Sequence, residues 1–83
     1  MATKAEVIEN FAKVIERDIR VGEPSSWLTS GNGKGVIFIP FPQDHADCVA
    51  LLAGQKRTVC IGGQDVTGSI TELATFAAQR AGW

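Results

Sequence analysis

Near the N-terminus apolar residues recur every three or four positions, the spacing that places them along one side of an α-helix. They are Val7, Ile8, Phe11, Ala12, Val14, Ile15 and Ile19. Thr3 and Glu6 form a capping-box pattern, in which each side chain satisfies a main-chain N–H of the first turn. Gly22 and Pro24 are typical of residues that end a helix. The pattern therefore predicts a first helix that starts after Thr3 and ends near Gly22.

The next segment has the pattern of extended chain. Residues Ser25–Ser30 (SSWLTS) predict a short, weakly patterned strand, whereas Val36–Phe41 (VIFIPF) is apolar on both faces, as in a strand at the centre of a sheet. Pairing is expected to stop or bulge near Pro40 and Pro42, because proline has no N–H to donate. Asn32-Gly33 supplies the positive φ angles of a hairpin turn between the two strands.

The glycines of this connection also suggest a phosphate-binding loop. Such a loop follows a strand, precedes a helix and has Ser or Thr directly after its lysine. Here Lys34 is followed by Gly35 and then by the strand pattern. We therefore interpret the glycine-rich segment as a turn.

A second helix is predicted after Asp44, which has the side chain of an N-cap and is followed by Asp47 in the first turn. Gly54 suits the position just after this helix. Residues Arg57–Ile61 (RTVCI) predict a third strand. Residues 62–65 then predict a turn that returns the chain through a short extended segment, Val66–Thr67.

A second capping-box pair, Ser69 and Glu72, predicts the start of a last helix, and Gly82 predicts its end. Its apolar side comprises Ile70, Leu73, Phe76, Ala77 and Ala81. The order of elements is thus α-β-β-α-β-β-α. This order predicts an α+β fold, with a small, mostly antiparallel sheet of three to four strands packed against three helices.

Size and charge narrow the function classes. The chain has 83 residues, 45% of them hydrophobic, and a net charge of −1, which predicts a single compact domain over residues 1–83. The balanced charge provides no long-range field that would attract nucleic acid or an anionic membrane. The longest apolar run is too short to span a bilayer, and glutamates interrupt the N-terminal segment where a signal peptide would be apolar. We expect a cytoplasmic protein without a membrane partner.

A thiol site is one alternative. His45 and Cys48 lie three residues apart at the start of the predicted second helix, where the helix dipole and an imidazolium would both favour a reactive thiolate. Asp44 and Asp47 oppose this, because nearby negative charge favours the neutral thiol. A metal site formed by His45, Cys48 and Cys60 would lack the paired short spacings of zinc modules. We predict no catalytic residues, no metal and no cofactor.

Nucleic-acid binding is a second alternative, with two candidate groups of basic residues. The groups are Lys34, Lys56 and Arg57, and on the first helix Lys13, Arg17 and Arg20. The helix group lies among acids such as Glu16 and Asp18. No aromatic RNA-binding pattern or reading helix accompanies either group, so direct contact with nucleic acid is not the favoured prediction.

The favoured prediction is a non-enzymatic module that binds another protein. Trp27 and Phe41 are its candidate apolar contacts, on a sheet face that the helices leave uncovered, and a homodimer would use the same face. Alternatively, the two aromatic residues complete the core.

In its size and lack of motifs the chain resembles phage and mobile-element accessory proteins that inhibit host machinery, anti-CRISPR proteins among them. The likeness assigns no family. It implies a nucleic-acid-binding host complex as a target, whose basic surface would face Glu9, Glu16, Asp18 and Asp44.

Overall fold

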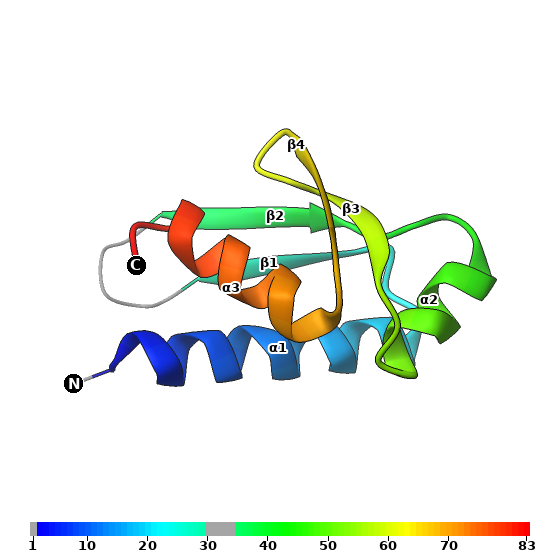
Figure 1. Ribbon diagram of the computed structural model, residues 1–83, viewed down its shortest axis with the longest axis horizontal. Helices are drawn as coiled ribbons and strands as arrows, with labels where there is room; N and C mark the ends of the chain where they lie inside the picture. Colours follow the sequence, from blue (N-terminus) through cyan, green and yellow to red (C-terminus); the bar gives the residue numbers. More distant parts are fainter. Residues whose placement is uncertain (1, 30–34) are drawn as a thin grey trace.

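The computed structural model describes residues 2–29 and 35–83 of the chain. Three helices and four strands follow one another in the predicted order (Figure 1). The helices are α1 (Lys4–Val21), α2 (His45–Leu52) and α3 (Ile70–Arg80), and the strands are β1 (Ser25–Thr29), β2 (Val36–Pro40), β3 (Arg57–Ile61) and β4 (Gln64–Gly68). The predicted α+β fold is confirmed. The Asn32-Gly33 turn lies outside the described residues.

The helix ends follow the predicted capping residues, with one difference. The capping box of α3 is complete, because Ser69 and Glu72 each accept a hydrogen bond from the other's main-chain N–H. In α1 only half of the box forms. Thr3 Oγ1 accepts from the Glu6 N–H at 3.2 Å, but the Glu6 carboxylate accepts from the Thr3 hydroxyl instead of from its N–H. Gly22 ends α1 at φ 82°, a left-handed conformation that glycine adopts without strain.

The four strands form two separate antiparallel ribbons, β1–β2 and β3–β4. β2 is therefore not the central strand that its apolar sequence predicts. Its burial alternates: Ile37 and Ile39 are buried, whereas Val36 and Phe38 are exposed. The consecutive apolar residues of β2 thus belong to two faces of the strand, one buried in the core and one exposed. The β3–β4 turn is the pair Gly62 and Gly63, at φ 59° and 81°, and β4 begins at Gln64, two residues before the extended segment that the sequence predicts.

The core lies between the helices and the inner faces of the ribbons. α1 runs along the length of the molecule and packs against α3 and β1, while α2 closes one end (Figure 1). α3 presents Ala74, Ala77 and Ala78 to the interior, and its C-cap residue Ala81 is buried as well, each with at most 2% of its surface exposed. Such small side chains let α1 and α3 approach closely. Larger fully buried side chains complete the core: Phe11, Ile15, Leu28, Ile39, Leu51, Ile61 and Leu73.

Candidate interaction surface

The outer face of the β1–β2 ribbon carries large apolar side chains that are exposed. Trp27 is 68% exposed, Val36 57% and Phe38 41%. Trp27 lies directly opposite Phe38, and Val36 lies next to them opposite Thr29. We call Trp27, Val36 and Phe38 the aromatic face.

The hydrogen-bond alternation of the ribbon explains why the two rings meet. The Phe41 N–H donates to the Pro24 carbonyl at 2.9 Å, one residue beyond the strand ends. Main-chain bonds alternate along an antiparallel pair, so Trp27 and Phe38 form a pair without mutual main-chain bonds, in which side chains lie closest. Their ring centroids are 4.6 Å apart, and the ring planes are tilted by 42°. This cross-strand contact fixes the orientation of the indole on the open face.

Of the two predicted apolar contacts, Trp27 is exposed, whereas Phe41 is buried, as in the alternative that places it in the core. Phe41 is only 7% exposed and belongs to the core. Its side chain lies on the inner side of the chain because it follows Ile37 and Ile39 at every second residue, and burial alternates along a strand. Phe38, on the opposite face, is the exposed aromatic residue of β2. Strict alternation through VIFIPF was the signal that would have identified it.

The predicted acidic contacts lie on α1 and at the start of α2, and each has a partner within the chain. Glu9 pairs with Lys13 at 3.2 Å and Glu16 with Arg20 at 2.8 Å, in both cases along α1. Asp18 accepts from the hydroxyl of buried Ser26 at 2.6 Å, which fastens α1 to β1. On α2, Asp44 caps the helix by accepting from the Ala46 N–H at 2.8 Å. Each of the four carboxylates thus has a local structural contact.

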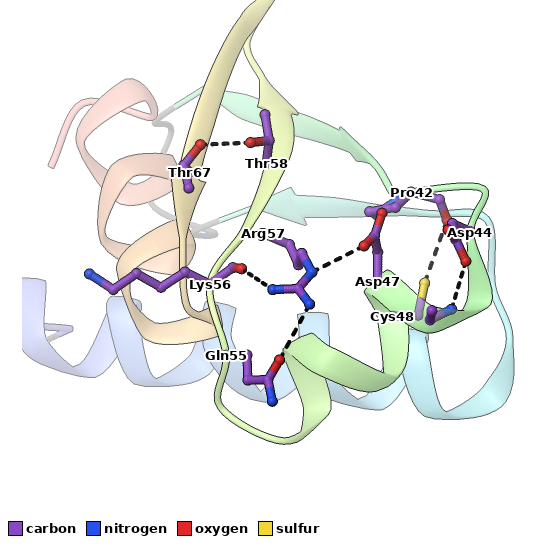
Figure 2. A network of polar contacts seen from close by, with 10 residues as sticks. Pro42, Asp44, Asp47, Cys48, Gln55, Lys56, Arg57, Thr58 and Thr67 are labelled. Carbon is purple, nitrogen blue, oxygen red and sulfur yellow. Dashed lines mark hydrogen bonds and ion pairs between the residues drawn. The ribbon is translucent and has the colours of Figure 1, made fainter.

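The candidate basic residues that lie in the described part of the chain are paired with acids in the same way. Arg57 lies at the centre of a polar network between α2 and β3, in which its guanidinium contacts Asp47, Gln55 and the main chain of Lys56 (Figure 2). The amino group of Lys56 lies 3.4 Å from Glu72. On α1, Arg17 pairs with Asp18. Lys34, which the sequence grouped with Lys56 and Arg57, lies outside the described residues.

The Cys48 thiol is held as a structural group. It is half-buried and donates to the Pro42 carbonyl at 3.5 Å (Figure 2). Burial raises the pKa of Cys48, and the carboxylates of Asp47 and Asp44 raise it further, because all three disfavour the thiolate. His45 is exposed, and no hydrogen bond of the described residues joins it to Cys48. Within residues 2–29 and 35–83, no group of His, Cys, Asp and Glu is arranged to hold a metal ion.

No helix in the described part of the chain is long and apolar enough to cross a membrane. Comparison with protein-family models, with curated proteins and with solved structures finds no match for this chain.

Proposed function

We propose that this protein is a non-enzymatic binding module that contacts another protein through the aromatic face. The observation that carries the proposal is the Trp27–Phe38 pair, in which a tryptophan with 68% of its surface exposed is oriented by a neighbouring ring. Tryptophan is enriched among the residues that dominate binding energy in protein interfaces. A ring held in place by its neighbour also loses little side-chain entropy on binding, so more of the contact energy contributes to affinity.

Polar groups elsewhere support the same assignment. The ion pairs Glu9–Lys13, Glu16–Arg20 and Asp47–Arg57 lie within the chain, and burial together with two carboxylates raises the pKa of Cys48. The aromatic face, in contrast, offers apolar area whose burial is favourable at about 25 cal/mol per Å². That the binding inhibits a host complex remains a prediction from the chain's size and lack of motifs.

Photo-crosslinking tests the proposal in cells of the source organism. A benzophenone amino acid replaces Phe38, and in a matched control it replaces Thr67, which lies on the outer face of the other ribbon. We expect a discrete adduct with a second protein from position 38, absent from position 67 and strongly reduced when Trp27→Ser is added. Equal adducts from both positions, or none from position 38, would contradict the proposal. An adduct of two copies would assign the face to a homodimer.

A thiol assay tests the non-enzymatic part. Because burial and two carboxylates raise the Cys48 pKa, alkylation of Cys48 by iodoacetamide at neutral pH should be slower than that of a free cysteine, and should accelerate only in the alkaline range. Asp44→Asn retains a capping side chain while it removes one charge, so it should lower the pKa and raise the rate slightly. Rapid alkylation at neutral pH would support the thiol-enzyme alternative.

A further inference from the structure

The β1 edge beside the aromatic face carries main-chain groups that point away from β2. The alternation set by the Phe41–Pro24 bond directs the N–H and C=O of Trp27, and the N–H of Ser25, to the outer side of β1. Among residues 2–29 and 35–83, no hydrogen bond to the main chain of Trp27 is present. Main-chain groups without a partner are very costly when buried, so a binding partner that pairs with them is favoured. An edge of this kind is a template for another strand.

Apolar side chains line both sides of this edge. Trp27 projects from β1 itself. The Asp18 side of α1 faces β1, because Asp18 accepts from Ser26 at 2.6 Å. Val21 lies three residues after Asp18, so it shares that side of the helix, and it is 67% exposed. An extended segment along β1 would therefore find main-chain partners in the strand and apolar contacts on either side.

The size of the aromatic face limits the kind of partner. From the exposed fractions of Trp27, Val36 and Phe38, its apolar area is roughly 350 Å², given that a large aromatic side chain buries about 150–250 Å². A stable interface between globular proteins buries about 800 Å² on each partner. The face by itself is thus too small for a stable dimer or a globular partner, but it is adequate for one short segment that also gains main-chain bonds.

The position of α1 disfavours a second copy as the occupant. α1 and β2 lie on opposite sides of β1 (Figure 1), and α1 packs against β1. A second copy that paired through its own β1 would bring its own α1 to the same side, where the first α1 already lies. A single extended segment carries no such layer.

We infer that the partner supplies an extended peptide segment that adds to the β1 edge as a third strand, with apolar side chains at alternate positions packed against Trp27 and Val21. This inference rests on the proposed function and specifies how the partner binds. Main-chain bonds would provide affinity, and the alternate apolar residues would provide selectivity, as in other complexes formed by strand addition.

The test uses the full chain and, as its probe, a displayed library of random linear peptides whose binders are resynthesised. We expect binders with apolar residues at every second position. In a synthetic chain, an ester in place of the Trp27 amide removes the outward N–H and retains the indole. It should weaken the binders about fivefold to tenfold, the effect of one lost hydrogen bond. The same change at Thr67, on the polar ribbon, should leave affinity unchanged.

Ser25→Pro is a second variant, because it also removes an outward N–H. Its partner across the ribbon is Pro40, a proline already accepted at the equivalent position. We expect peptide binding to be lost and, in the wild type, the amides of Ser25 and Trp27 to become protected from hydrogen exchange when peptide is bound. No binders, or binders unaffected by both changes, would overturn strand addition. If Trp27→Ser then still strongly reduced crosslinking of the cellular partner from position 38, the proposed function would still hold.

Discussion

The two ribbons have the same architecture, but the side chains on their outer faces differ in polarity. Each pairs two strands of five residues, buries one face and leaves the other open. On β3–β4 one of the two outer pairs is Thr58 and Thr67, whose hydroxyls hydrogen-bond to each other at 2.6 Å. On β1–β2 the central outer pair is Trp27 and Phe38. An outer face needs only polar residues to be compatible with water, so the exposed aromatic pair is the feature on which the proposed contact with another protein rests.

The largest effect on stability is expected on the inner face of β1, and a much smaller one on its outer face. Leu28 is 1% exposed on the inner face of β1, so Leu28→Ala should lower the free energy of unfolding by about 2–5 kcal/mol through lost burial and a residual cavity. Ile39→Val is the milder change on β2, at about 0.5–1.5 kcal/mol. Chemical denaturation measures both. A loss for Leu28→Ala no larger than that for Trp27→Ala would contradict the assignment of inner and outer faces.

Removing the Ser26–Asp18 hydrogen bond should have the next largest effect on stability. Ser26→Ala leaves the largely buried carboxylate of Asp18 without its 2.6 Å donor, and loss of a hydrogen bond to a charged group costs about 1.5–3 kcal/mol. Asp18→Asn retains a side-chain acceptor, so it should cost less. If Ser26→Ala unfolds at the same denaturant concentration as the wild type, the contact does not fasten α1 to the ribbon.

The aromatic pair should matter less for stability than for binding. A double-mutant cycle with Trp27→Ser and Phe38→Ser should give a coupling energy of about 0.5–1.5 kcal/mol, typical of aromatic pairs. The folded state should persist in both variants, since neither residue belongs to the core. Loss of cooperative unfolding in either single variant would show that the face is structural.

The β3–β4 ribbon allows the same coupling energy to be measured for its outer threonine pair. Thr58→Ala and Thr67→Ala remove a cross-strand hydroxyl pair that is exposed to solvent, so their coupling should amount to about 0.2–1 kcal/mol. Thermal unfolding of the single and double variants measures it. A coupling equal to or above that of Trp27 and Phe38 would remove the distinction between the two ribbons.

The smallest expected effect is a pH dependence where β4 meets α3. The Ser69 N–H and then Lys56 lower the pKa of the Glu72 carboxyl, so the contribution of Glu72 is present at neutral pH and declines as pH falls below about 5, through its folded-state pKa. Glu72→Gln should be slightly less stable than the wild type at neutral pH and equal to it in acid. If the difference in stability between Glu72→Gln and the wild type stayed constant across this pH range, the carboxylate would not be its cause.

Local chemistry was readable from the sequence alone. The capping residues Thr3, Asp44 and Ser69 begin the three helices as predicted, because a cap needs only a side-chain oxygen within a few residues of the main-chain groups that it satisfies. The order α-β-β-α-β-β-α follows from periodicity in the same way. These features depend on neighbours in the chain.

The tertiary structure decided which apolar residues are covered. The sequence of β2 is equally compatible with a strand between two others and with a strand that has one open face, since both contain consecutive apolar residues. Packing places Phe41 in the core and leaves Phe38 exposed beside Trp27. Burial depends on residues distant in the chain, here on how α1 and α3 fill one side of the ribbons, and that arrangement cannot be read from a short sequence window.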